Sequence, residues 1–490
     1  MSSKTRKNLY WLTPIWLLII VLALYVLFQI PMRAKAGQPN VLFITMDSLR
    51  HDHLGCTGYQ RAHTPNIDAL ARDGAVFMQA VAQGTYTRIS VPSIVTGKFA
   101  LLTGVKLLQG YLDSTHTTMA EVLSADEYFT CSTTRIWSDS FYQGFDTTGT
   151  SHATTEQRTE QTIRALEQHE DEKLFIWLYY WDPHAPYKPP DEFMRLYEPD
   201  YTEISLKELM AKAKDEATRL RDHTGHYNGS IATLLEAGSG KIKLTAMDRE
   251  HLLNLYDAEI AYVDSEIGKV VAKLKKMGLY DNTLIVLNAD HGEAFGEHQR
   301  YYHGMTVYDE EARVPLIIKP PYSRNKNKVV QDQVRNIDIL PTVLDYCGLK
   351  TPEDCNGQTL RPLIETDSSP DLPSITETYA GKHPTRRLLM AALRHQGHKL
   401  IYDLGEERVL LYDLRVDPRE KKNLLPEAAT IEPIPGEAQD PARQKEQQMR
   451  AELLDLLRLQ RISDLASAEE NLEEIDEKTR EQLKALGYIY

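Results

Sequence analysis

Two apolar, strand-like segments of this chain run directly into residues that can bind a metal ion. Leu284–Asn288 leads into Asp290 and His291, and Val41–Thr45 leads into Asp47. Open α/β sheets bind ligands at the carboxyl edge of their strands, so we expect both ends to meet there. Burying carboxylate and imidazole groups is costly unless a metal or hydrogen bonds compensate. Because these groups are ordinary ligands of zinc-like metals, the pattern predicts a shared cation.

A hydroxyl-rich run, residues 85–97, lies between these strand ends and leads into an apolar segment. A hydroxyl at a helix start commonly caps the first backbone N–H groups. It can also serve as a nucleophile when a metal activates it, because the helix N-terminus favours an anionic substrate. The local pattern leaves both roles open.

A third strand-like segment, Leu174–Tyr180, is followed by Asp182 and by His184, which is held between two prolines. This placement suits a fixed imidazole that faces a cleft, although a surface turn histidine would have the same sequence pattern. His298 and His303 follow Asp290 closely and are expected to reach the same cleft.

The elements that must position these groups alternate between strands and helices. Helical spacing over 156–168 and 247–277 separates the apolar strands, which include Val314–Ile318. This order predicts an α/β fold with a mainly parallel central sheet and helices on both faces. Later segments read as a small C-terminal antiparallel sheet. The predicted parts are a catalytic domain (39–385) with a polar insertion at 200–245, a small sheet subdomain (386–425), and a linker with a charged helical tail (426–490).

The N-terminal residues predict a membrane anchor. Residues 9–31 are apolar and uncharged, which is long enough to cross a bilayer core of ~30 Å. Basic residues within 1–8 place that end in the cytoplasm, so the catalytic domain is expected on the extracytoplasmic side. A cleaved signal peptide is the alternative, because Ala34-Lys35-Ala36 resembles a cleavage site.

Charge and cysteine content exclude some classes of protein. The net charge of -14 argues against a nucleic-acid partner, which would require a basic surface. The four cysteines do not make a disulfide scaffold, although Cys347 and Cys355 are close enough in sequence to pair in an oxidising compartment.

Taken together, the motifs resemble the sulfatase family of the alkaline phosphatase superfamily. The similarity covers roughly 39–425 and the closing Leu483–Tyr488. Its motifs, in chain order, are Asp47–Gly55, Thr64–Asp68, Thr96-Gly97, Asp182–Tyr187, Asp290–Glu293, His303-Gly304, Tyr308–Pro315, Asp338–Thr342 and Leu411–Leu424. The resemblance implies an alkaline phosphatase-like fold and a metal-dependent ester hydrolase.

Departures from the family pattern change the expected chemistry. Sulfatases usually carry two successive aspartates where this chain has Asp47-Ser48. Family spacing from Thr96-Gly97 places Thr87 at the nucleophile position, in a run without the family's Cys- or Ser-x-Pro-x-Arg pattern. We therefore expect an unmodified threonine and no formylglycine. Arg88 beside it would either orient substrate oxygens or lie in solvent.

The second residue of the Asp-His pair bears on the metal. Many calcium-dependent sulfatases have Asn where this chain has His291, and imidazole suits zinc or manganese better than calcium. We expect one divalent ion, zinc or manganese in preference to calcium or magnesium, on Asp47, Thr87, Asp290 and His291. A second metal on Asp182, His184 and His303 would be an extension of this site.

The predicted function is hydrolysis of sulfuric or phosphoric esters by attack of metal-bound Thr87. His184 or His303 would hold substrate oxygens or protonate the leaving group. The predicted partners are an anionic sulfate, phosphate or phosphonate ester and, through the N-terminal helix, a membrane. Two alternatives are a phosphotransferase that acts on envelope lipid or glycan and a membrane-anchored scaffold without activity.

Overall fold

A computed structural model describes residues 37–105, 111–135, 139–150, 153–199, 230–323, 326–366, 372–380, 387–425 and 441–464. The chain divides into two units, Met1–Pro39 and Asn40–Tyr490, and every element below belongs to the second. The predicted N-terminal segment (1–8) and anchor (9–31) lie outside the described residues. Within the described residues, no helix combines the length and apolar character needed to span a membrane.

An eight-stranded sheet forms the centre of this unit, with the order β10-β2-β9-β6-β1-β5-β3-β4. All of its strands run parallel except β9, which is antiparallel to both of its neighbours. The strands β1, β5 and β6 are buried almost throughout, which explains their continuous apolar sequences. The strand bounds are β1 Asn40–Met46, β2 Ala75–Val81, β3 Tyr128–Ser132, β4 Thr147–Thr148, β5 Lys173–Tyr180, β6 Thr283–Ala289, β9 Arg313–Lys319 and β10 Lys328–Arg335.

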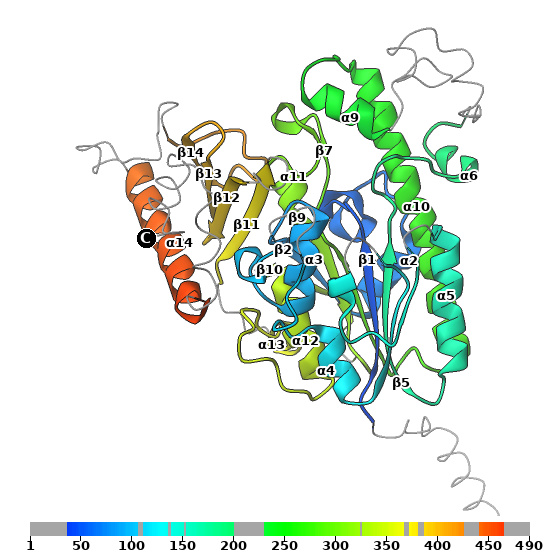
Figure 1. The fold of residues 1–490 in the computed structure, drawn as a ribbon. Helices are drawn as coiled ribbons and strands as arrows, with labels where there is room; N and C mark the ends of the chain where they lie inside the picture. The colour runs from blue at the N-terminus through cyan, green and yellow to red at the C-terminus, as the bar shows by residue number, and fades with distance from the viewer. Residues whose placement is uncertain are drawn as a thin grey trace, which may run out of the picture. The chain divides into compact units, whose positions relative to one another are not determined.

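Helices cover both faces of the sheet, which confirms the predicted α/β class (Figure 1). One face carries α2 (Pro65–Asp73), α5 (Thr155–Gln168), α6 (Asp191–Met194), and α10 (Ala246–Lys276). The other carries α3 (Thr87–Thr96), α4 (Met119–Ala125), α12 (Ile339–Tyr346) and α13 (Arg361–Glu365). The long helix α10 starts at a capping box in which Thr245 and Asp248 satisfy each other's backbone N–H groups.

Shorter elements complete the unit, and part of the predicted insertion is helical. Helix α9 occupies Ile231–Gly238 within the predicted insertion, whereas residues 200–229 lie outside the described residues. The remaining short elements are β7 Ala294–Phe295, β8 Tyr301–Tyr302, α11 Asp309–Ala312, and the 3-10 turns η1 His51–His53, η2 Gly55–Thr57, η3 Ala100–Thr103, η4 Asp139–Tyr142, η5 Glu297–Gln299 and η6 Asn336–Asp338.

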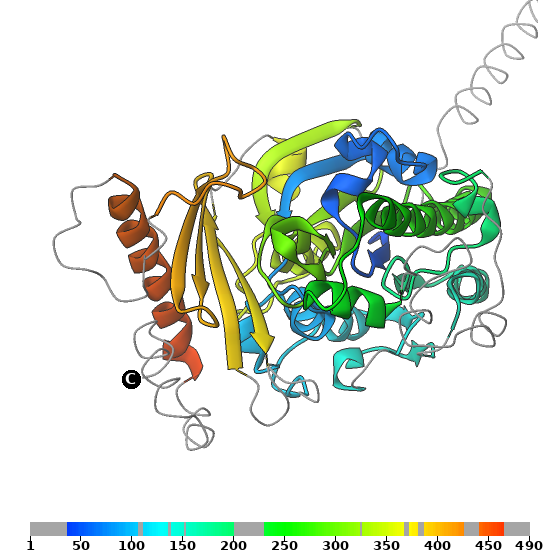
Figure 2. The same ribbon diagram turned by 90° about the horizontal axis from the view of Figure 1, so that it is seen from above.

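The predicted small antiparallel sheet is present and has four strands: β11 Ser374–Ala380, β12 Arg387–His395, β13 His398–Asp403 and β14 Arg408–Asp413. It starts at β11, which the predicted boundary at 386 assigned to the catalytic domain. Helix α14 (Pro441–Asp464) packs on β12 and β13 through the buried Met449 (Figure 2). The predicted linker at 426–440 and the tail beyond 464 lie outside the described residues.

Strand β11 joins the small sheet to two loops of the main domain. The Thr376 hydroxyl donates to the Ala82 carbonyl at 2.6 Å, and the Glu377 backbone N–H donates to Gln83. The Thr378 hydroxyl donates to the Gly304 carbonyl at 2.7 Å. The loop before Thr87 and the loop after His303 are therefore held by one strand.

The four cysteines are free thiols. Cys347 is buried, and the Cys355 thiol donates to the Gly97 carbonyl at 3.4 Å. The Cys347–Cys355 pairing that the sequence left open is therefore not formed in this structure.

A buried ion network also connects the small sheet to α11 of the main domain. Lys399, which is 1% exposed, places its Nζ 2.8 Å from the Asp309 carboxylate and 2.8 Å from that of Glu420. Arg394 pairs with the other Asp309 oxygen at 3.0 Å. Breaking such a network by removing one partner is costly, because the remaining charges stay buried.

We therefore expect Lys399→Met to lower the free energy of unfolding by about 3–5 kcal/mol, because Asp309 and Glu420 lose their shared cation. Urea denaturation of the full chain measures this effect. Lys350→Met is the control, because the Lys350–Glu353 pair is exposed at 82% and 89%. It should cost less than about 1 kcal/mol. Equal losses in the two variants would contradict a stabilising role for the network.

Candidate active site

The strand register brings the predicted metal ligands together. Strands β1 and β6 pair in parallel with Met46 opposite Ala289, so the next residues, Asp47 and Asp290, leave the sheet side by side. His291 follows directly. Asp47, Asp290 and His291 are each 0% exposed, and each offers a ligand atom within 4.8 Å of the others. The carboxyl edge of the sheet thus collects a buried group that suits a cation.

One nitrogen lies at the centre of this group. His291 Nδ1 is 2.9 Å from the Gly292 carbonyl, a contact that requires a proton on Nδ1 and leaves the Nε2 lone pair free to bind. That Nε2 lies 3.2 Å from Thr87 Oγ1, 3.5 Å from Asp290 Oδ2 and 3.6 Å from Asp47 Oδ1. Four possible ligand atoms, from the ends of β1 and β6 and from the start of α3, therefore converge.

These separations fit a single divalent metal. A tetrahedral ion with bonds of about 2.1 Å has ligands about 3.4 Å apart, close to the three distances from Nε2. Burial raises the pKa of Asp47 above its ordinary value, and the neighbouring Asp290 carboxylate raises it further. Two adjacent buried carboxylates resist joint ionisation without a cation, and a bound ion would remove that penalty.

The structure shows where the hydroxyl groups of residues 85–97 point. Tyr86 is the N-cap of α3 and makes no side-chain capping bond, so Thr87 begins the helix without capping it. The other serine and threonine hydroxyls of the run donate to backbone carbonyls, namely Thr85 to Thr306, Ser90 to Asp290, Ser93 to Ile89 and Thr96 to Pro92. Thr87, which is 3% exposed, faces His291 instead. Arg88 follows it in the first turn of α3 and is partly buried.

His184 and His303 lie beside the group formed by Asp47, Asp290 and His291. The His303 ring centroid is 4.3 Å from that of His291 and 4.9 Å from that of His184. His303 Nδ1 contacts Glu293 Oε1 at 3.1 Å, and its Nε2 has no hydrogen-bond partner among the described residues. Burial lowers the pKa of both His184 and His303, so both imidazoles are neutral near pH 7.

Two further expectations are not matched by the geometry. Asp182 accepts a hydrogen bond from the Thr155 hydroxyl, and the described residues gather no second group of three close ligand atoms. A second metal on Asp182, His184 and His303 is therefore not supported.

His298 stacks on Tyr308 and contacts Glu310, so it does not reach the cleft. Its Nε2 contacts the Glu420 carbonyl at 3.0 Å, in the segment that follows β14.

Sequence reasoning missed Tyr179 and Glu293 as site residues. The Tyr179 hydroxyl donates to Asp47 Oδ2 at 2.8 Å and lies 3.2 Å from Asp290 Oδ2. Glu293 accepts a hydrogen bond from the Tyr187 hydroxyl at 2.9 Å and also contacts His303. Tyrosine is common in buried strands, so nothing local distinguished Tyr179. Glu293 directly follows the Asp-His-Gly motif, which was an available signal.

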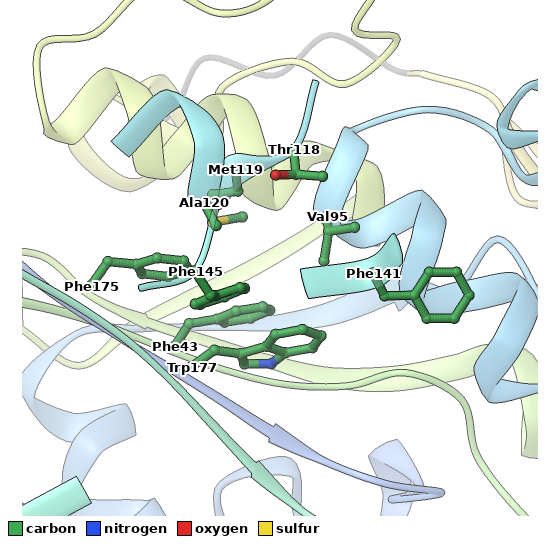
Figure 3. Close-up of a pocket in the computed structure, with 9 residues that line it drawn as sticks. All are labelled: Phe43, Val95, Thr118, Met119, Ala120, Phe141, Phe145, Phe175 and Trp177. Carbon is green, nitrogen blue, oxygen red and sulfur yellow. The ribbon is translucent and has the colours of Figure 1, made fainter. Parts of the chain in front are cut away.

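An apolar pocket lies elsewhere in the unit. Figure 3 shows aromatic side chains of β1 and β5, including Phe43 and Trp177, facing residues of α3 and α4. Its lining is Phe43, Val95, Thr118, Met119, Ala120, Phe141, Phe145, Phe175 and Trp177. It borders the middle of these strands and offers no charged group to an anionic ester.

Comparisons with known proteins identify the class that this fold and site define. The Sulfatase family model matches residues 39–349, and the model for the N-sulphoglucosamine sulphohydrolase C-terminal region matches 296–446. The chain therefore belongs to the sulfatase family and is a sulfatase-like ester hydrolase.

Individual relatives are distant but cover most of the chain. An ulvan-active sulfatase of Formosa agariphila is 27% identical over 81% of this chain and 79% of its own length. An N-acetylglucosamine-6-O-sulfatase of Bacteroides thetaiotaomicron is 24% identical over 81% of this chain and 84% of its own length.

Solved structures share the fold. A protein in complex with its substrate D-glucosamine-2-N,6-O-disulfate aligns with a TM-score of 0.70 and 22% identity, over 88% of this chain and 100% of the other. The phosphonate monoester hydrolase of Agrobacterium radiobacter aligns with a TM-score of 0.67 and 20% identity, over 86% and 96%.

We expect Asp290→Asn to lose the metal, because it removes one of two anionic ligands from a closed site. Metal content, measured by plasma mass spectrometry after dialysis of the full chain, should fall to roughly one tenth of that of the wild type or less. Asp113→Asn, which alters an exposed carboxylate, should retain the wild-type content. Equal metal content in all three proteins would contradict the assigned ligand.

Proposed function

We propose that this protein hydrolyses a monoanionic ester by nucleophilic attack of Thr87, with one divalent metal held by Asp47, Thr87, Asp290 and His291. The observation that carries this proposal is the convergence on His291 Nε2, with the Thr87 hydroxyl at 3.2 Å and one oxygen of each carboxylate at 3.5–3.6 Å. When bound, the metal would lower the pKa of the threonine and offset charge on the ester oxygens.

The reaction then takes two displacement steps. In the first, Thr87 Oγ1 bonds to the central sulfur or phosphorus, the bond to the leaving-group oxygen breaks, and the hydroxyl proton ends on that oxygen. In the second, water cleaves the covalent intermediate, restores the hydroxyl and releases the acid. The N-terminus of α3 favours the negative charge of the transferred group.

The neighbouring histidines supply hydrogen bonds without adding charge. His184 and His303 are both neutral because burial lowers their pKa values. His184 Nδ1 contacts the Ala185 carbonyl and so carries the proton, which leaves Nε2 to accept a hydrogen bond from the attacking water. His303 Nε2 has no partner among the described residues and can donate to an ester oxygen or accept from water, depending on its tautomer. With two buried carboxylates balanced by one divalent ion, the centre suits a substrate with a single negative charge. Arg88 is proposed to orient the ester oxygens from the first turn of α3.

An unmodified threonine favours a phosphorus centre. A sulfo-threonine lacks the hemiacetal-type release that formylglycine provides, whereas a phosphorylated or phosphonylated threonine can be attacked by water. Phosphodiesters and phosphonate monoesters are therefore the proposed substrates, with sulfate monoesters as the competing class. Location outside the cytoplasm and retention by residues 9–31 are proposed with this function.

We expect Thr87→Ala to lower kcat/KM by at least about 1000-fold, because it removes the attacking oxygen. The measurement is turnover of aryl sulfate, phosphate monoester, phosphodiester and phosphonate monoester substrates with zinc, manganese, calcium or magnesium. Thr87→Ser should retain part of the activity. Ser93→Ala is the control, since Ser93 lies on the same helix and donates to Ile89. Undiminished turnover of Thr87→Ala on every ester would refute the assignment.

The chemical state of position 87 is tested separately. Peptide mass spectrometry of the active protein should give the mass of an intact threonine, because the Cys- or Ser-x-Pro-x-Arg pattern is absent around Thr87. A synthetic peptide with the same sequence provides the unmodified reference mass. An oxidised residue at position 87 would overturn the proposal of an unmodified nucleophile.

A further inference from the structure

We infer that Tyr179 and Ser48 take the place of a further acidic ligand and set which cation the centre binds. This inference rests on the metal-dependent function proposed above. It assigns Tyr179 as a positioning residue, which acts through the carboxylates without touching the substrate.

Tyr179 limits how Asp47 can bind. Its hydroxyl donates to Asp47 Oδ2 at 2.8 Å, whereas Asp47 Oδ1 faces His291. The phenol is fully buried and packs edge-on against Trp177, with ring centroids 5.8 Å apart. The hydrogen bond from Tyr179 holds Oδ2 toward the phenol, so Oδ1 is the Asp47 oxygen that faces the other candidate ligands.

Asp290 is restricted in the same way from the opposite side. Its Oδ1 accepts the backbone N–H of Ser48 at 3.2 Å and that of His291 at 3.0 Å. Its Oδ2 faces His291 Nε2 and is 3.2 Å from the Tyr179 hydroxyl. Rotation of Asp290 toward bidentate binding would leave buried N–H groups unpaired, which is costly. Both carboxylates are therefore held in a monodentate arrangement.

Ser48 supplies a hydrogen-bond donor at a position where an aspartate would supply oxygen ligands for the metal. Its hydroxyl donates to Asp47 Oδ1 at 2.9 Å, and its backbone has a φ of 59°, in the left-handed region. The Tyr256 hydroxyl fixes this turn by donating to the Ser48 carbonyl at 2.7 Å. Position 48 thus orients Asp47 and brings no negative charge to the centre.

The consequence is a small set of metal-ligand atoms, one of which is a nitrogen. The protein offers one oxygen from Asp47, one from Asp290, the Thr87 hydroxyl and one imidazole nitrogen. Calcium takes about 6–8 oxygen ligands, often with bidentate carboxylates, whereas zinc and manganese accept imidazole and fewer donors. The centre therefore selects a transition metal over calcium.

The test measures metal affinity directly, by competition with a chromophoric chelator on the full chain, with zinc, manganese and calcium in turn. Tyr179→Phe should weaken zinc and manganese binding by about 10-fold or more, the range expected for residues that orient ligands. It should also reduce the difference in affinity between these two metals and calcium, because Asp47 becomes free to bind a metal through both oxygens. Tyr180→Phe is the matched control, since its hydroxyl contacts Thr159 at 2.7 Å, away from the centre.

A second variant keeps the test decisive if Tyr179→Phe folds poorly. Ser48→Asp should strengthen calcium binding by about 10-fold relative to Ser48→Asn, which has a similar shape without the charge. Aspartate and asparagine both tolerate the left-handed backbone at this position.

The outcomes separate the two proposals. If the wild type binds none of these metals, the metal-dependent function fails and this inference fails with it. If the wild type binds metal but Tyr179→Phe behaves as Tyr180→Phe does, and Ser48→Asp as Ser48→Asn does, only the inference on selectivity is overturned.

Discussion

The structure depends on the meeting of two carboxylates at one buried sheet edge. Asp47 and Asp290 extend two adjacent strands that pair in register, and neither side chain reaches solvent. Such a pair would be destabilising alone. The imidazole of His291, the hydroxyl of Tyr179 and the first residue of α3 are all placed around it. These groups together form a framework that suits a cation.

Much of the fold was predictable because its central strands are buried on both faces. Strands β1, β5 and β6 have continuous apolar sequences, and α10 has a long helical repeat, so each was identified within a residue or two. Strand β10, with the sequence KVVQDQVR, is an edge strand with neither a continuous apolar run nor a regular alternation, so its sequence does not indicate a strand. The antiparallel direction of β9 depends on long-range pairing, which local sequence does not encode.

The site was predictable to a different degree for each residue. Asp47, Asp290 and His291 follow recognisable strands, so their meeting follows from parallel topology. Thr87 required the family spacing, because its helix contains several hydroxyls and only the structure shows where the others donate. Tyr179 was not predictable, since its role depends on which side of β5 it faces and on the rotation of two distant carboxylates.

The contacts of β11 have a consequence for the minimal catalytic unit. The sulfatase family match ends at residue 349, and every predicted metal ligand lies before that point. Yet Thr376 and Thr378 secure the loop before Thr87 and the loop that carries His303. A chain shortened to the matched region would keep all the ligands while losing the strand that sets the spacing between the helix start and the histidine loop. The small sheet is therefore part of the framework that holds the surroundings of Thr87 and His303 in place.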